Sequence, residues 1–207
     1  MHQASSVHTR WSMPVGTGIA LLGAVLLIIP VSGRQAVVMT GAFVLVAAAM
    51  ELVLSLRTND PSVRRIELAL SAIAFLSALL ILANPIAFRL LFVAIFCLGL
   101  RGLGAIAAAF LSAGAVRLWF LAQGLVDMLL ATILIAGTPL AAVISVIAGG
   151  RWPPGSAAIL ANFIAVSLLA AGISLIGVGI ALRNGRDQDR SVAAHAEIEG
   201  SGRATDR

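Results

Sequence analysis

Charged residues are scarce in this 207-residue chain, at 11% of the sequence, and lysine and tyrosine are missing altogether. About a quarter of an ordinary soluble domain is charged. Apolar residues reach 60%, more than a soluble fold of this size can hide behind so few charges. These shortages exclude a soluble enzyme, a disordered protein and a nucleic-acid-binding protein. The net charge of +5 comes from scattered arginines, so it indicates membrane topology rather than a nucleic-acid partner.

Residues that usually carry catalysis or bind metals are also few. The single cysteine, Cys97, allows no intramolecular disulfide, and the three histidines lie near the chain ends without clustering. The letters from Gly102 to Ala107 match a dinucleotide fingerprint, but they lie inside an apolar run with no preceding strand. No phosphate-binding loop, zinc-protease motif or nucleophile elbow is present. The sequence therefore predicts no catalytic residue, no metal site, no cofactor and no enzymatic activity.

The abundant apolar residues fall into six long runs. Each has about 18–27 residues, near or above the roughly 20 that a helix needs to cross the hydrocarbon core. Helix is the expected state, because backbone polar groups in lipid must be satisfied within the segment. We therefore predict an all-α integral membrane protein with a short N-terminus (1–10), a six-span membrane domain (11–183) and a disordered tail (184–207). The predicted runs are Val15–Val31, Gln35–Leu56, Ile66–Ala83, Ile86–Leu111, Leu118–Ala136 and Ser156–Leu182.

Two short segments have no span assigned. About nine apolar residues after Pro139 are too few to cross the bilayer, so they either extend the fifth helix or lie at the outer surface. The outer loop at 149–155 contains Arg151-Trp-Pro-Pro-Gly155 and predicts a rigid interfacial turn or a contact site.

The arginines predict the orientation. With a cytoplasmic N-terminus, eleven of the fourteen arginines fall on the cytoplasmic side, as the excess of positive charge in cytoplasmic loops requires. Trp11 and Trp119 then lie at the inner ends of the first and fifth spans, where aromatic anchors are common. Both termini are therefore predicted to be cytoplasmic.

Three prolines divide the chain into similar units. Pro30, Pro85 and Pro139 are 55 and 54 residues apart, and each follows an apolar run. Leu21, Leu76 and Leu130 coincide when the runs are aligned on these prolines, as do the small residues Gly23, Ala78 and Thr132. We predict three sequential helix hairpins, about 11–57, 66–112 and 117–183, that form parallel internal repeats about an axis along the membrane normal.

These paired helices, with a proline at the outer end of the first and an arginine closing the second (Leu-Ser-Leu-Arg57, Ala-Leu-Arg183), resemble the HdeD-like acid-resistance membrane proteins. The resemblance covers about residues 11–183. It implies a six-span protein of the bacterial inner membrane with an envelope-stress or acid-stress role. It carries over no catalytic residue.

Three ionisable residues lie within spans, where each costs roughly 2.5–3.5 kcal/mol on insertion scales. At 1.5 Å per residue, Asp127, Arg101 and Glu51 lie roughly 13, 16 and 9 Å from the same face. Arg101 and Asp127 therefore reach similar depths on consecutive antiparallel helices, and we predict that they pair. Gln123, one turn before Asp127, is expected to complete the hydrogen bonding. Glu51 is expected to reach toward Arg57 or the interface.

The role of these residues stays open between an ion pair that fixes helix packing and a relay for protons or ions. Small residues in the fourth and sixth spans predict close helix contacts, either within the chain or at a dimer face. They are Gly104-xxx-Ala108, Ala105-xxx-Ala109 and Ala170-xxx-Ser174.

The leading functional hypothesis is a non-enzymatic, HdeD-like membrane protein that acts through the lipid bilayer, a homo-oligomer or an envelope protein partner. The alternative is a transporter or channel for protons or small solutes that uses Glu51, Arg101 and Asp127. A membrane-embedded enzyme is the least supported class, because no pair of spans presents a convergent set of polar residues.

Overall fold

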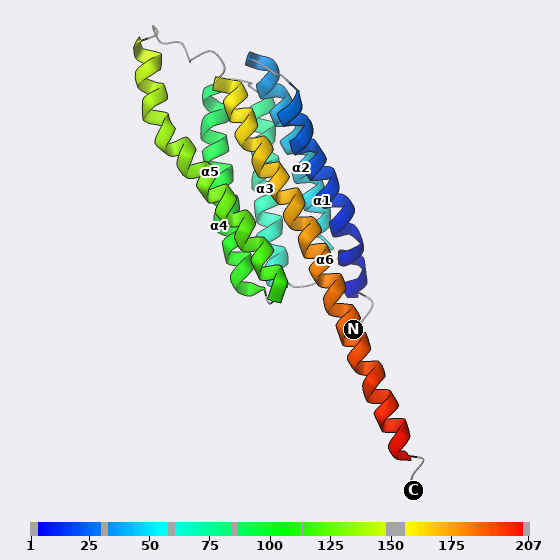
Figure 1. Cartoon of the computed structure of the whole chain (residues 1–207). Coiled ribbons are helices and arrows are strands. Elements are labelled where there is room, and N and C mark those ends of the chain that lie inside the picture. The colour runs from blue at the N-terminus through cyan, green and yellow to red at the C-terminus, as the bar shows by residue number, and fades with distance from the viewer. Residues whose placement is uncertain are drawn as a thin grey trace.

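Six helices account for nearly all of the structure, a computed structural model that describes residues 4–29, 33–57, 61–83, 87–112, 114–147 and 156–204. Figure 1 shows them side by side in one bundle. No strand occurs among the described residues. The helices are α1 (Ala4–Ile28), α2 (Gly33–Ser55), α3 (Pro61–Ala83), α4 (Ala87–Leu111), α5 (Gly114–Ile147) and α6 (Ser156–Ala204).

Each helix contains a segment long and apolar enough to cross a bilayer, so the chain is a multi-pass membrane protein. This confirms the predicted all-α membrane fold with six spans. α2 and α5 begin at Gly33 and Gly114, whose φ angles of 54° and 60° are a left-handed conformation that glycine adopts without steric cost. The two prolines at positions 30 and 85 and the outer loop at 149–155 lie outside the described residues.

Two helices extend beyond the predicted spans. α5 continues through Pro139 to Ile147, so the apolar stretch after that proline extends the fifth helix, one of the two alternatives. Its last turns lean away from the other helices (Figure 1).

α6 continues to Ala204, where the sequence predicts a disordered tail. α6 contains no proline, and four of residues 191–204 are alanine, which favours helix. The tail therefore projects from the bundle as a helix, at the same end as the N-terminus (Figure 1).

α6 is the most enclosed helix of the bundle. Within the structure, 56% of its span is buried, against 22–33% for the other five spans. It packs most extensively on α1 and also contacts α2, α4 and α5. The other large interfaces are α4–α5 and α2–α3, and each exceeds the interfaces inside the predicted hairpins, α1–α2, α3–α4 and α5–α6. The first and last spans thus close the bundle into a ring.

The α1–α6 interface is built on small residues, and we call it the glycine seam. A methyl group on Gly16 would lie 2.7 Å from the carbonyl oxygen of Gly172, and one on Gly23 would lie 2.7 Å from that of Ala165. Both pairs, Gly16 with Gly23 and Ala165 with Gly172, are seven residues apart. That spacing returns the same face of each helix to its partner over two turns, so the two backbones stay close along the membrane.

The small residues predicted in α4 and α6 are used inside the chain. Gly104 packs against the Leu70 side chain of α3, and Ala105, Ala108 and Ala109 are buried. In α6 the Ser174 hydroxyl donates to the Trp119 carbonyl at 3.3 Å, while Ala170 is half-buried.

The closest α4–α5 approach lies at Gly102 and Gly124, a pair that the sequence analysis missed. A Cβ on Gly124 would lie 2.9 Å from the Gly102 carbonyl oxygen. Gly102 therefore serves helix packing here.

Candidate functional site

Four helices bring polar side chains to one place inside the bundle. Glu51 comes from α2, Arg101 from α4, Asp127 from α5 and Ser167 from α6. Asp127 is 0% exposed, while the side chains of Glu51 and Arg101 are each 17% exposed. We call Glu51, Arg101 and Asp127 the charge cluster.

The predicted pair between Arg101 and Asp127 is present. The Arg101 Nε atom lies 3.5 Å from Asp127 Oδ2. This distance is within ion-pair range, but Oδ2 has no hydrogen-bond partner. The contact is therefore electrostatic, and one oxygen of a fully buried carboxylate lacks a donor.

Glu51 was expected to reach toward Arg57 or the interface, but it pairs with Arg101 instead. Its Oε1 accepts a hydrogen bond from Arg101 Nη2, in an ion pair that joins α2 to α4. Arg57 instead lies over the Trp11 ring, 4.8 Å from the ring centre. A guanidinium inside a bundle needs more than one partner to offset its desolvation, and Glu51 supplies the second carboxylate.

Ser167 makes the hydrogen bond that was expected from Gln123. Its hydroxyl donates to Asp127 Oδ1 at 2.5 Å, while Gln123 is buried and lines a neighbouring cavity. The sequence carried one weak signal for this role, a serine in the middle of an apolar span. Serine is common in spans because its hydroxyl can bond the preceding turn, so that signal alone does not single it out.

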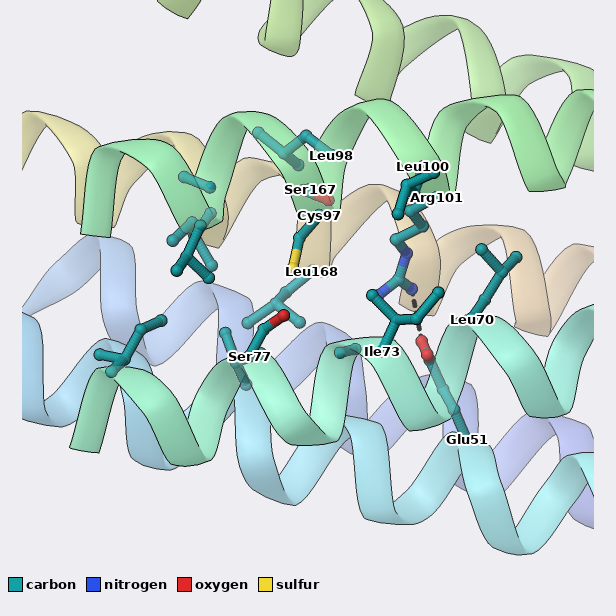
Figure 2. Close-up of a pocket in the computed structure, with 16 residues that line it drawn as sticks. Glu51, Leu70, Ile73, Ser77, Cys97, Leu98, Leu100, Arg101, Ser167 and Leu168 are labelled. Atoms are coloured by element: carbon teal, nitrogen blue, oxygen red, sulfur yellow. Dashed lines mark hydrogen bonds and ion pairs between the residues drawn. The ribbon is translucent and has the colours of Figure 1, made fainter. Parts of the chain in front are cut away.

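Two members of the charge cluster, Glu51 and Arg101, line two cavities. The first, which we call the mid-bundle cavity, has a volume of about 60 Å³, and its polar wall includes Ser77, Cys97 and Ser167. In Figure 2, Arg101 reaches across it toward Glu51, and Cys97 and Ser77 face one another. The volume exceeds the roughly 10–15 Å³ that one water needs, so the cavity can hold several waters beside the cluster.

The second cavity, which we call the end cavity, measures about 80 Å³ and is also large enough for several waters. Its wall includes residues near helix ends, such as Ser55, Ile66 and Phe120. Glu51, Leu70 and Arg101 line both cavities. The Glu51–Arg101 ion pair therefore lies between two cavities, each large enough for water, at different depths in the bundle.

The charges of the cluster do not balance. Two carboxylates and one guanidinium sum to −1 when all three are ionised. An unbalanced charge within a bilayer-spanning bundle is expensive, because the low dielectric leaves it poorly solvated. The arrangement favours the uptake of one positive charge.

Within the described residues, no group of three or more His, Cys, Asp or Glu side chains gathers as a metal site would require. Comparison of the chain with protein-family models, curated proteins and solved structures finds no match. The functional argument therefore depends on the geometry of the charge cluster and its cavities.

Proposed function

We propose that this protein is a transporter or channel that carries protons or small solutes across the membrane by way of the charge cluster. One observation supports this most directly: Glu51 and Arg101 line two cavities at once. An ion pair that only fixed helix packing would be expected to be sealed by apolar side chains. Here both partners are partly accessible, and space for water lies on each side.

Flux measurements in vesicles test this proposal. The purified protein, reconstituted into lipid vesicles that enclose a pH-sensitive dye, should conduct protons when a pH gradient is imposed. Asp127→Asn should abolish that flux while the protein still folds. Glu197→Gln is the matched control, since Glu197 lies in the part of α6 beyond its membrane span. Absence of flux from wild-type vesicles, for protons and for a panel of small ions, would count against transport.

A second candidate is a non-enzymatic role in envelope or acid stress, of the kind the HdeD-like resemblance implies. The observation that favours it is the contact pattern of the bundle. Large interfaces (α2–α3, α4–α5, α6–α1) alternate with smaller ones (α1–α2, α3–α4, α5–α6), which is the pattern expected if three similar hairpins surround one axis. This alternation supports the proposal of three parallel repeats.

Survival of a deletion strain after acid exposure tests the stress role. Loss of survival should be restored by the wild-type protein. Restoration by Asp127→Asn as well would separate the stress role from transport through the cluster, and normal survival of the deletion strain would contradict the stress role.

The proposed location is the bacterial inner membrane with both termini cytoplasmic. This orientation is supported by Arg57, Arg64, Arg65, Arg117 and Arg183, because all are exposed at or near ends of membrane spans that lie on one side when the spans alternate in direction. Many large apolar side chains are exposed on the helices, which fits the lipid bilayer as the main partner. A homo-oligomer or an envelope protein partner is part of the same proposal, and cross-linking in native membranes tests it.

A further inference from the structure

The surplus negative charge of the cluster needs a partner of small size and positive charge. We propose that Glu51, Arg101 and Asp127 form a binding site for a single proton, shared by the two carboxylates, with Arg101 pairing with whichever carboxylate is ionised. This inference rests on the proposed transport role and names its substrate as the proton.

Charge balance is the first argument. With one proton bound, the cluster is neutral, so the cost of a net charge inside the bundle disappears. The count covers the three residues joined by the two ion pairs, and other polar groups lie around them. From α3, Glu67 lines the end cavity; from α4, Cys97 lines the mid-bundle cavity; α6 contributes the Ser167 hydroxyl. α1 has no titratable side chain between Trp11 and Ile28.

The unequal contacts of Arg101 are the second argument. Its Nη2 makes a hydrogen-bonded pair with Glu51, while its Nε contacts Asp127 only at 3.5 Å, without a hydrogen bond to Oδ2. Asp127 is therefore a fully buried carboxyl with one oxygen unsatisfied by the protein. The guanidinium makes a hydrogen-bonded ion pair with Glu51 but only a longer electrostatic contact with Asp127. This difference is expected if the two carboxyl groups share one proton.

The positions of the two carboxyl groups supply a route for exchange. Glu51 is partly exposed and lines both cavities, so water in the end cavity can reach it. Asp127 has no exposed surface, but its hydrogen-bond partner Ser167 lines the mid-bundle cavity. Glu51 thus meets cavity water directly, whereas Asp127 is linked to the mid-bundle cavity through the Ser167 hydroxyl.

One exchange step conserves charge throughout. A hydronium ion in the end cavity gives its proton to Glu51 and becomes water. Arg101, which keeps its own protons, moves its pairing to Asp127. Asp127 passes its proton to the Ser167 oxygen, and the Ser167 hydroxyl gives its own proton to a water in the mid-bundle cavity. One proton enters and one leaves, and the cluster carries no net charge before or after.

Infrared spectroscopy of the full chain in lipid vesicles tests the proton directly. A protonated carboxyl gives a carbonyl stretching band that is separate from the bands of ionised carboxylates and that shifts in heavy water. We expect this band in the wild type at neutral pH. Glu51→Gln and Asp127→Asn should each abolish it, because one carboxylate and Arg101 then balance without a proton. Glu197→Gln, the matched control in the part of α6 beyond its membrane span, should retain the band.

The outcomes separate this proposal from the transport role. Absence of the band from the wild type overturns the proton site, whether or not the variants fold. Persistence of the band in Glu51→Gln overturns the sharing of one proton. A missing band together with a melting temperature that rises with Na⁺ or K⁺ concentration would replace the proton by a metal cation. A band present in vesicles that show no proton flux supports the site and contradicts transport.

Discussion

The glycine seam and the charge cluster both hold helices together in lipid, but they do so by opposite means. In the seam, Gly16 and Gly172 let α1 and α6 approach until their backbones touch, and dispersion forces act along the contact. In the cluster, Arg101 bridges carboxylates of α2 and α5 across a space that also admits water. The seam has no room for an added atom, whereas the stability of the cluster depends on the balance of its charges.

This contrast divides the bundle into a fixed part and an adjustable part. Contacts in the seam depend on shape and are indifferent to protonation. Contacts in the cluster depend on which groups are ionised, and an ion pair beside cavities has room to rearrange. Each of the following substitutions changes one region only and so tests whether the seam is fixed and the cluster adjustable.

Loss of the central cation should have the largest effect. Arg101→Leu leaves two buried carboxylates without a cation, and removing one member of a buried ion pair costs about 3–5 kcal/mol. Unfolding of the purified protein by a denaturing detergent measures the change. A double-mutant cycle with Asp127→Asn provides the control, because the second substitution removes one stranded charge. Additive effects in that cycle would show that the Arg101–Asp127 pair contributes no coupling energy.

A steric change in the seam should come next. Gly16→Leu forces a side chain against the Gly172 carbonyl, and overpacking of this kind costs about 3 kcal/mol at the upper end of its usual range. Gly99→Leu is the matched control, since a Cβ at Gly99 meets no atom within 4 Å. The same unfolding assay should show this loss at every pH from 5 to 8. A pH-dependent loss would contradict the division between the two regions.

Removal of the hydroxyl that supports Asp127 should have a smaller effect. Ser167→Ala deletes the hydrogen bond to Oδ1, and the expected loss is about 1–2 kcal/mol, given the value of bonds to charged groups and the modest values measured between membrane helices. Thr132→Ala is the control, because that exposed hydroxyl bonds only the Met128 carbonyl of its own helix. Equal losses for the two variants would mean that Ser167 does not support the cluster.

The smallest effect is expected at the helix ends. Arg57→Ala removes the guanidinium from the Trp11 ring, a contact worth about 0.5–1 kcal/mol at exposed sites. Arg64→Ala, also at an exposed position, should change stability less. Tryptophan fluorescence on titration with detergent measures both variants. If Arg57→Ala lowered the stability as much as Gly16→Leu, the Arg57–Trp11 contact would contribute as much to the stability of the bundle as the packing at Gly16.

Spacing along the chain was enough to predict the six spans and the Arg101–Asp127 pair. Both residues lie at similar depths on consecutive antiparallel helices, so depth alone brings them together. The partner of Glu51 could not be found in this way. Its direction depends on how α2 is rotated toward α4, and α2 is apolar on nearly every face, so no polar stripe in the sequence reveals that rotation.

Contacts between distant parts of the chain were also beyond the sequence analysis. The seven-residue spacing of glycines in α1 and α6 can be seen in the sequence, but many glycines in apolar runs face lipid, as Gly99 and Gly137 face open space here. For the helical tail, the composition gave two conflicting indications. Its charge suggested disorder, whereas its alanine content favoured helix, and the composition alone did not decide between them.

The closure of α1 against α6 has a consequence for biogenesis. During synthesis α1 enters the bilayer before the other five helices, yet its principal partner, α6, follows all of them. The spans α2 with α3 and α4 with α5 are neighbours in the chain and can associate as soon as both are inserted. The small-residue face of α1 must meanwhile be covered by lipid or by a chaperone. The α1–α6 interface therefore forms late in assembly, when α6 inserts and displaces the lipid or chaperone from α1.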